Sequence, residues 1–509
     1  MTVADNTPIL VGVGQRTFRD SGHRERTPVD ALQCAIELAM EDSGAYKALQ
    51  GAIDVLITEP SLLEVTPELA ALLPQYPSIE LAKRLGFDSR CLKAPEGGNG
   101  PQMLVNHFAQ QLHEGKARAV AIAGGELSAS LRALLGNGHD ISHWPKAEPG
   151  QCDEPWPNRD GANAEEHRHN LWLPTHMYPL FENALRHRYG HTLEQHLAHI
   201  GRIMEGLSHT ACENPDAWSY QRPRDAATLM SFGDSSPYLA FPYNRYLCAQ
   251  MNVDMAAAVI LTTVGTAREL GIASDRWIYL HGCADANEVW YVSEREDLSR
   301  SSSIEIAGKA ALQRAGCDID DIAIMDLYSC FPCAVELACD ALSIDPFGDR
   351  ALSLTGGLPY FGGPGHSYSL HAITTIVQQL RERPEDRGLI TANGWYMTKQ
   401  SIGVYSATPP SSAWQRGDDR ELQARIDNAP HPQVEAAPEG AARVDSYTVV
   451  CNKGVPDQGI IVGRLDSGAR FIAHTEQDET LFKQLLSEDV IGQRGQVSAG
   501  ETHNLFRFD

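Results

Sequence analysis

The stretch GGNG at residues 97–100 decides the fold, because the chain repeats its plan far downstream as GGPG at residues 362–365. Both copies continue through the tripeptide QQL to an apolar run, 119–123 in the first copy and 388–392 in the second. Each copy predicts a tight glycine turn, a helix of several turns and a short buried strand stopped by glycine. Two copies so far apart do not make a solenoid, which needs at least three stacked units, so we expect a duplicated half-domain.

The repeat extends upstream of each glycine turn. An amphipathic helix pattern at 28–44 leads to a β-branched strand at 53–58, and a similar helix at 304–316 leads to a strand at 322–327. Alternating helices and strands in two similar halves predict a layered α/β fold. Because each glycine turn opens a helix, free N–H groups and the positive end of the helix dipole gather there and stabilise negative charge.

Length and composition describe an ordinary globular protein of several structural units, with 509 residues, 42% of them hydrophobic and 21% charged. No apolar run approaches the ~20 residues that span a bilayer, and the start has no signal-peptide pattern. The 11 cysteines follow no disulfide framework, which indicates a reducing compartment. A net charge of −24 repels phosphate backbones. We therefore expect a cytoplasmic protein with neither a membrane span nor a nucleic-acid partner.

Shifts in composition divide the chain into several parts. Residues 131–235 are polar and rich in His, Trp and Pro, which predicts a helical loop domain over one end of the sheet. Near the C-terminus, short alternating segments joined by glycine turns predict a small β-rich domain, a sandwich or a barrel of the oligonucleotide-binding (OB) type. The predicted boundaries are 1–130 for the first half, completed by 236–266; 131–235 for the loop domain; 267–408 for the second half; 409–442 for a linker; and 443–509 for the β-rich domain.

Five sequence motifs carry a resemblance to a known family. Those of the two halves resemble the thiolase superfamily, and those of the loop domain are similar to sterol-carrier-type thiolases; the resemblance covers about residues 5–406. The additional β-rich C-terminus resembles the branch called thiolase-like proteins type 1. The resemblance implies a duplicated thiolase fold of two βαβαβαββ halves, a helical loop domain and a small C-terminal OB-like barrel. The motifs are ILVGVGQRTF at 9–18, AIAGGELS at 121–128, DMAAAVILT at 254–262, YGHTLEQHLA at 189–198 and NPDAW at 214–218.

The resemblance also implies where a thiolase carries its reactive side chains. A cysteine at the first glycine turn is acylated, a histidine in the second turn activates it, and a second cysteine on the last strand moves protons. In this chain the matching positions hold Gly97, Gly363 and Asn393. Glycine has no nucleophile, so we expect the ordinary thiolase mechanism to be absent. Gly97 and Gly363 are instead predicted to bind the substrate, with their helix N-termini polarising its carbonyl group.

Tyr328 opens the motif YSCF where sterol-carrier-type thiolases carry His-Asp-Cys-Phe, so the resemblance puts its hydroxyl at the oxyanion hole. The hydroxyl can donate a hydrogen bond or lose its proton; the alternative is a buried tyrosine at a strand end. Cys330 is the only thiol placed near this site. With Cys333 it also matches a dithiol redox pattern, for which the alternative is that both cysteines pack in the core.

Two further side chains are candidates for acid–base work. His366 lies just past the second glycine turn and can supply the imidazole that is missing at residue 363. The alternative is that it caps the helix or faces solvent. Asn393 can donate a hydrogen bond from the position of the acid–base cysteine, or it completes a turn before Gly394. The predicted catalytic set is Tyr328, His366, Cys330 and Asn393.

The loop domain, which binds coenzyme A in the thiolase family, offers arginines for the phosphates of that ligand. Arg186 and Arg188 are the predicted phosphate ligands, and plain surface charges are the alternative. Histidines within 187–199 have the i,i+3 and i,i+4 spacing of a metal site on one helix face, but no HExxH or Cys/His framework accompanies them. A polar helical lid explains them better, and we expect no metal.

The leading hypothesis is an enzyme that transfers an acyl group, or forms or cleaves a carbon–carbon bond, on a coenzyme A thioester without a cysteine-bound intermediate. A retro-aldol step is one example, with Tyr328 and His366 as acid–base groups. No covalently bound cofactor is expected, and an acyl-CoA is the expected substrate. The alternative is a non-catalytic protein that binds acyl-CoA or lipid, or a scaffold whose C-terminal domain recruits a protein partner. Either is expected to be a monomer or a homodimer.

Overall fold

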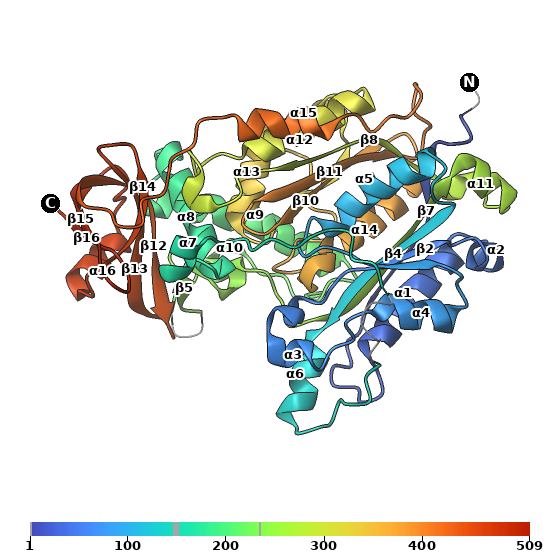
Figure 1. Ribbon diagram of the computed structural model, residues 1–509, viewed down its shortest axis with the longest axis horizontal. Helices are drawn as coiled ribbons and strands as arrows, with labels where there is room; N and C mark the ends of the chain where they lie inside the picture. Colours follow the sequence, from blue (N-terminus) through green and yellow to red (C-terminus); the bar gives the residue numbers. More distant parts are fainter. Residues whose placement is uncertain (1–2, 146–151, 234–235) are drawn as a thin grey trace.

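The computed structural model describes residues 3–145, 152–233 and 236–509. The main body of the molecule is a nine-stranded sheet in the order β3-β2-β4-β7-β1-β8-β11-β10-β9 (Figure 1). The first half of the chain supplies one side of this sheet and the second half supplies the other. The strands are β1 Pro8–Thr17, β2 Val55–Thr58, β3 Arg90–Lys93, β4 Ala119–Leu127, β7 Asp254–Thr263, β8 Ile278–Asn287, β9 Ile324–Asp326, β10 Arg387–Gly394 and β11 Lys399–Ser406.

The order of the strands shows the duplication that the repeated turns predict. Counted outward from the centre, the first half runs β1-β7-β4-β2-β3 and the second runs β8-β11-β10-β9, so the second half repeats the order of the first four strands. The halves join where β1 and β8 pair antiparallel, with Ile9 opposite Tyr279 and Leu10 opposite Ile278. The predicted α/β fold of two similar halves is confirmed.

Helices cover both faces of the sheet. They include α1 Pro28–Asp42, α5 Gly100–His113, α12 Ser302–Ala315 and α14 Tyr368–Glu382. The helices α5 and α14, which follow the two glycine turns, contact each other and strands of both halves, so they lie at the centre (Figure 1). Helix α1 packs on β1, and α12 packs on β8. A Cβ at Gly14 would overlap the carbonyl of Ala35, and one at Gly282 would overlap that of Ala311, so both halves use a strand glycine for close helix packing.

The loop domain is helical, as the sequence predicts. Its helices are α7 Ala164–Arg168, α8 Pro174–Tyr189, α9 Leu193–Glu213 and α10 Ala226–Leu229. Helix α8 ends at Gly190, which has a positive φ of 67°, and the side chain of Thr192 then caps α9 by accepting from the N–H of Gln195. Helix α13, Pro332–Leu342, packs against α8 and α9. These helices lie between the central sheet and the C-terminal strands (Figure 1).

The C-terminal strands form a closed barrel. Its strand order is β12-β13-β14-β16-β15, the pairing of β15 with β12 closes it, and β14 runs parallel to β16. A helix, α16 Glu479–Leu485, connects β14 and β15. This is the arrangement of an OB fold, so the predicted OB-like barrel is confirmed. The strands are β12 Gly440–Asn452, β13 Val455–Leu465, β14 Arg470–Thr475, β15 Arg494–Ser498 and β16 Leu505–Phe508.

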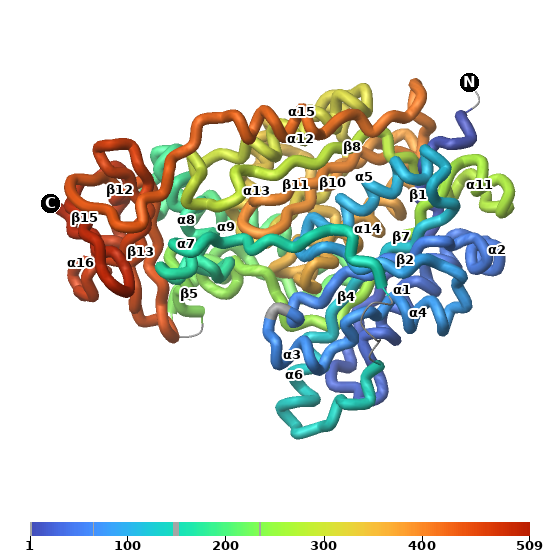
Figure 2. Tube along the Cα trace, in the orientation of Figure 1, coloured from blue at the N-terminus to red at the C-terminus, as the bar shows by residue number. Residues whose placement is uncertain are grey.

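Short segments around the barrel differ from the prediction. The strands β5 Tyr238–Ala240 and β6 Tyr243–Asn244 lie in the stretch expected to complete the first half, but β5 pairs with β12 at Val450. Helix α15, Asp419–Asp427, lies in the predicted linker, which runs past α12 to the barrel (Figure 2). Segments this short hold too few residues for a periodic pattern, so tertiary packing decides their structure.

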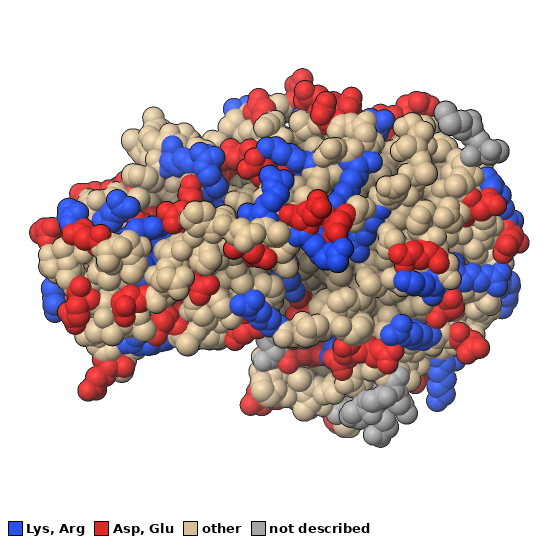
Figure 3. Space-filling view, turned by 45° about the horizontal axis from the view of Figure 1, so that its top comes forward, with Lys and Arg blue, Asp and Glu red and all other residues tan. Residues whose placement is uncertain are grey.

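Surface charge is mixed rather than gathered in one stripe on the face drawn in Figure 3, where basic and acidic side chains are interspersed. Among the helices that the structure describes, none has both the length and the apolar composition needed to cross a membrane. The apolar side chains pack in the interior. The largest core cluster includes residues of α5, α14 and strands of both halves.

Candidate active site

The two glycine turns meet in the middle of the molecule. The N–H of Gly97 donates to Nδ1 of His366 at 3.1 Å, and the hydroxyl of Ser369 donates to the carbonyl of Gly98 at 2.9 Å. Gly97 and Gly362 hold φ angles of 133° and 127°, which glycine adopts without strain. The first turn leads into α5 and the second into α14, so the N-terminal ends of both central helices lie at one site.

Tyr328 lies directly against the first turn. A Cβ at Gly98 would overlap the hydroxyl oxygen of Tyr328 and would lie 2.7 Å from the carbonyl oxygen of Asn393. The side-chain nitrogen of Asn393 lies 3.9 Å from Sγ of Cys330. The structure therefore brings the predicted catalytic set together around the first glycine turn.

Gly363 is placed differently from the prediction. Its N–H donates to the carbonyl of Gln250 at 2.9 Å, and its nearest neighbours are residues 249–251. The N–H of Gly97 is likewise engaged, by His366. Because both N–H groups already have acceptors, neither of these two groups is free to polarise a bound carbonyl group.

Glu59 is a candidate residue that sequence reasoning missed. It follows β2 and is 4% exposed, and neither carboxylate oxygen has a hydrogen-bond partner within the described residues. A Cβ at Gly100 would lie 2.8 Å from Oε2 of Glu59, so the carboxylate contacts the first turn of α5. Burial raises the pKa of Glu59 well above its usual range, and the charge of Lys399 opposes this shift only in part. A buried, unpaired carboxyl group of this kind is suited to general acid–base catalysis.

Lys399, the first residue of β11, occupies the space that a side chain at residue 97 would fill. Its Nζ lies 2.8 Å from the Cβ position of Gly97 and donates to the carbonyl of Glu96. Burial lowers the pKa of Lys399 to about 8, and the charges of Glu59 and Glu96 oppose the shift. Glu59 follows the carboxyl end of β2, where the sites of α/β proteins gather, and this is the signal that could have found it. Lys399 lies at the amino end of β11, opposite Gly394 at the carboxyl end of β10, so only the pairing of the two strands brings it to the same edge.

The imidazole of His366 is buried, and its Nδ1 is engaged by the first glycine turn. Because Nδ1 accepts from Gly97, the neutral ring carries its proton on Nε2, which is buried and has no partner in the part of the chain that the structure describes. Burial lowers the pKa of His366 to about 3, and the charges of Lys399 and Lys93 add to the shift. The ring is therefore neutral at physiological pH, and its Nε2–H can donate to a substrate oxygen.

Burial also decides the protonation of Tyr328 and Cys330. It raises the pKa of Tyr328 well above its usual range and the pKa of Cys330 to about 12, so both groups keep their protons at neutral pH. The amide of Asn393 is engaged, because Nδ2 donates to the hydroxyl of Tyr178 at 2.9 Å and Oδ1 accepts from Gln400 at 3.0 Å. Tyr328 thus remains a donor, whereas Cys330 and Asn393 help to build the wall of the site.

The thiols of Cys330 and Cys333 are expected to be unreactive in the folded protein. Both are free and buried, and burial raises the pKa of each thiol, whereas redox pairs need a lowered pKa. DTNB at pH 8 should label neither cysteine in the native state and both after unfolding, with the sites assigned by mass spectrometry. The partly exposed Cys212 is the internal control and should react first. Rapid native-state labelling of Cys330 would support the dithiol hypothesis instead.

A second carboxylate lies against the second glycine turn. A Cβ at Gly365 would overlap Oε1 of Glu126, whose carboxylate accepts from the hydroxyl of Ser61 at 2.8 Å and the N–H of Leu62 at 2.6 Å. Burial raises the pKa of Glu126 to about 7. Glu126 and Glu59 line the same narrow pocket of about 30 Å³. Glu126 is a satisfied structural acceptor, whereas Glu59 is not satisfied.

Arg186 and Arg188, the predicted phosphate ligands, have other partners. Arg186 is 1% exposed, and its guanidinium donates to the hydroxyl of Tyr447 at 2.7 Å and to the carbonyl of Glu488 at 3.1 Å. Arg188 forms an ion pair with Asp340. The difference from the prediction arises because the barrel packs on α8, so that Arg186 joins the helix to the barrel and its guanidinium is not available to a ligand phosphate.

Comparisons with known proteins bear on this arrangement. A family model described as the thiolase-like protein type 1 additional C-terminal domain matches residues 421–502. The crystal structure of a monomeric SCP2-thiolase-like protein type 1 from Mycobacterium smegmatis is 30% identical, covers 100% of both chains and has a TM-score of 0.85. The chain belongs to this family of thiolase-like proteins.

More distant relatives of this thiolase-like protein share its fold. The Ltp2–ChsH2(DUF35) aldolase is 16% identical over 83% of this chain and 100% of that chain, with a TM-score of 0.59. The Acat5 thiolase from Ascaris suum, in complex with coenzyme A, is 15% identical over 79% of this chain and 99% of that chain, with a TM-score of 0.55. The 3-ketoacyl-CoA thiolase of Shewanella halifaxensis is 23% identical over 231 residues. That match spans 42% of this chain and only half, 50%, of the curated relative.

Proposed function

We propose that this thiolase-like protein forms or cleaves a carbon–carbon bond in a coenzyme A thioester by an aldol-type reaction, with no acyl group on the enzyme. One observation carries the proposal: the buried carboxylate of Glu59 has no partner among the described residues, and it shares the first glycine turn with the donors Tyr328 and His366. A base without a partner among the described residues, beside two groups that can donate, suits a reaction that moves one proton and stabilises one developing oxyanion.

In the cleavage direction, the substrate is a 3-hydroxyacyl thioester. Glu59 takes the proton of the 3-hydroxyl group, the bond between C2 and C3 breaks, and its electron pair passes to the thioester carbonyl. The products are a ketone or aldehyde and the enolate of the shortened thioester, which Glu59 protonates at C2. The Nε2–H of His366 and the hydroxyl of Tyr328 hold the enolate oxygen, and a raised carboxyl pKa suits both proton transfers.

The relatives support the substrate class. One is named a 3-ketoacyl-CoA thiolase, one fold neighbour was crystallised with coenzyme A, and another is named an aldolase. Acyl transfer, the other reaction expected from the sequence, lacks a thiolate nucleophile at this site because Cys330 keeps its proton and residue 97 is glycine. A reaction at a carbon–carbon bond is therefore the better supported of the two.

Binding without chemistry is a second candidate function. The side chains at the site are enclosed, since Glu59, His366 and Tyr328 are 4%, 7% and 8% exposed and the adjoining pocket is narrow. A thioester reaches them only after neighbouring segments move apart. The enclosure therefore supports a protein without turnover at this site, which binds acyl-CoA elsewhere or serves as a scaffold whose barrel recruits a protein partner.

Turnover separates the two functions. We expect the full-length protein to convert a 3-hydroxyacyl-CoA into a shorter acyl-CoA and a carbonyl compound, or to run the reverse reaction, as detected by liquid chromatography and mass spectrometry. Tyr328→Phe should lower kcat by about 10²–10³-fold, as the loss of one oxyanion donor does, with little change in melting temperature. Stabilisation by CoA thioesters without product in either direction would favour the binding function. If neither binding nor product is seen, the aldol-type reaction and the binding of acyl-CoA are both lost, and only the scaffold function remains.

A further inference from the structure

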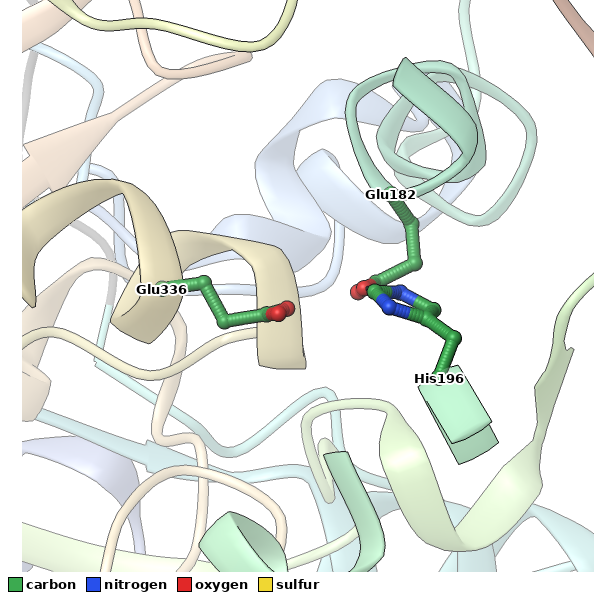
Figure 4. A group of neighbouring side chains, drawn as sticks. All are labelled: Glu182, His196 and Glu336. Atoms are coloured by element: carbon green, nitrogen blue, oxygen red, sulfur yellow. The ribbon is translucent and has the colours of Figure 1, made fainter. Parts of the chain in front are cut away.

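Three helices meet around a buried group of side chains that can bind a metal. Helix α8 contributes Glu182, α9 contributes His196 and α13 contributes Glu336, and each residue is at most 1% exposed. Their donor atoms all lie within 4.8 Å of one another. Figure 4 shows the carboxylate of Glu336 pointing from its helix toward Glu182 and His196, which lie together on the opposite side.

Two of these three side chains have hydrogen-bond partners, whereas Glu336 meets no donor among the described residues and faces the carboxyl group of Glu182. Nε2 of His196 lies 2.5 Å from Oε1 of Glu182, whose Oε2 accepts from the hydroxyl of Tyr243 at 2.5 Å. Neither oxygen of Glu336 has a hydrogen-bond partner in the described ranges, although Nε2 of His199 lies 3.3 Å from one of them. An almost fully buried carboxylate without a hydrogen bond is rare, and its direction points to a partner at the centre of the group.

Two buried carboxylates also face each other here. The donor oxygens of Glu182 and Glu336 lie within 4.8 Å of each other between the three helices. A proton shared by the two carboxyl groups would relieve their repulsion, but it would leave Nε2 of His199 without a partner among the described residues. A divalent cation relieves the repulsion and engages both carboxylates and both imidazoles at once.

We propose that Glu182, His196 and Glu336 bind one divalent transition-metal ion, with His199 as the fourth ligand. Two carboxylates and two imidazoles suit Zn²⁺. A tetrahedral Zn²⁺ holds such donors at about 2.1 Å, and therefore about 3.4 Å apart. The donor atoms of Glu182, His196 and Glu336 lie within 4.8 Å of one another, close to this spacing, and Nε2 of His199 lies 3.3 Å from Glu336. The hydrogen bond from Tyr243 orients Glu182, as outer hydrogen bonds commonly do for metal ligands.

Histidine rings connect this group with the surface. The centroid of the His191 ring lies 5.8 Å from that of His196 and 5.4 Å from that of His199. Nδ1 of His191 has no partner in the part of the chain described, and the side chain of His199 is 18% exposed. A metal ion can thus pass from solvent along two imidazoles to the buried carboxylates, which supplies the entry path that a metal site requires.

The proposed ion also joins elements that support the candidate active site. Helix α8 carries Tyr178, which accepts from Asn393, and α13 begins directly after the segment that holds Tyr328. Loss of the ion is therefore expected to loosen the packing of α8, α9 and α13 together, and to lower the melting temperature of the whole protein.

Metal content of the full-length protein tests the proposal. After stripping with dipicolinate, reloading with ZnCl₂ and gel filtration, we expect one zinc per chain by ICP mass spectrometry and a higher melting temperature than that of the stripped protein. Glu336→Gln, which keeps the shape of the side chain, and His199→Ala should each retain less than about a tenth of this zinc. His187→Gln changes a half-exposed histidine of α8 that pairs with Asp489; it is the matched control and should retain the zinc.

Cobalt gives a readout that is independent of stability. Reloading with Co²⁺ should produce a visible d–d spectrum of a four-coordinate site in the wild type, and Glu336→Gln should lack it. The proposal is overturned if the wild type keeps no stoichiometric zinc, or if Glu336→Gln and His199→Ala keep as much as the wild type. If Glu336→Gln melts at a higher temperature than the wild type and zinc does not change that temperature, the two carboxyl groups share a proton and bind no metal.

Discussion

Replacing Glu59 with glutamine is expected to lower aldol-type turnover by about 10²–10⁴-fold, the usual contribution of a positioned acid–base group, while the affinity for the CoA thioester is retained. Glutamine keeps the shape of the side chain but cannot take the proton of the 3-hydroxyl group. Steady-state kinetics measures kcat, and calorimetry measures binding. Glu68→Gln, on the exposed helix α3 Pro67–Ala70, is the matched control. An unchanged kcat in Glu59→Gln would show that another group is the base.

The same substitution has an expected effect on stability that depends on pH. Because the folded-state pKa of Glu59 is raised by burial, the wild type is most stable where Glu59 is protonated, and it loses stability as the pH rises from the ordinary value of 4.5 through the raised pKa. Glutamine does not ionise, so the stability of Glu59→Gln relative to the wild type should increase over this range. Each unit of raised pKa corresponds to about 1.4 kcal/mol. Denaturant unfolding at several pH values measures the difference, and an identical pH dependence in both proteins would contradict the buried, unpaired state of the carboxylate.

Replacing Arg186 with alanine is expected to lower the free energy of unfolding by about 1–3 kcal/mol, the usual cost of leaving a buried polar group without its hydrogen-bond partner. The guanidinium donates to Tyr447 and to the carbonyl of Glu488 across the contact between α8 and the barrel. Alanine removes both of these donors, and the hydroxyl of Tyr447, which also donates to the carbonyl of Glu488 at 2.8 Å, loses its own donor. Urea unfolding followed by circular dichroism measures the loss. Arg188→Ala is the matched control; its ion pair with Asp340 is partly exposed, so it should cost about 1 kcal/mol or less.

Affinity for coenzyme A separates the structural role of Arg186 from the predicted phosphate-binding role. If the barrel contact is its function, the folded fraction of Arg186→Ala should bind a CoA thioester as the wild type does. Weaker binding of the CoA thioester without a loss of stability would contradict the barrel contact. It would support the prediction that Arg186 binds a phosphate of coenzyme A. Calorimetry below the unfolding transition measures the affinity of the folded protein alone.

Local patterns are enough to predict most of the fold. The two glycine turns, the helices that follow them and the buried strands show in hydrophobic periodicity and in glycine placement, which involve residues close together in the chain. The same holds for the OB barrel, whose strands alternate between apolar and polar residues. The short elements β5, β6 and α15 cannot be predicted from local patterns. A partner in the tertiary structure, such as β12 for β5, decides their conformation.

The candidate site is predictable only where it touches the repeated turns. The resemblance to thiolases and the position just past a repeated glycine turn point to Tyr328 and His366, and the structure places both at the first turn. Glu59 follows β2 of the first half, and Lys399 opens β11 of the second half. No spacing in the chain connects these two residues, so only the folded sheet shows that both lie against the same glycine turn.

By itself, the sequence determined the duplicated α/β fold, the glycine turns and the barrel, because periodicity and backbone conformation depend on neighbouring residues. Only the tertiary structure decided which side chains share a site and which protons they hold, because burial and pairing depend on residues far apart in the chain. Lys399 fills the space beside Gly97, and burial makes His366 a neutral donor. In the same way, the histidines of α9 lacked a metal framework in the sequence, and the folded chain brings Glu182 and Glu336 to them from two other helices.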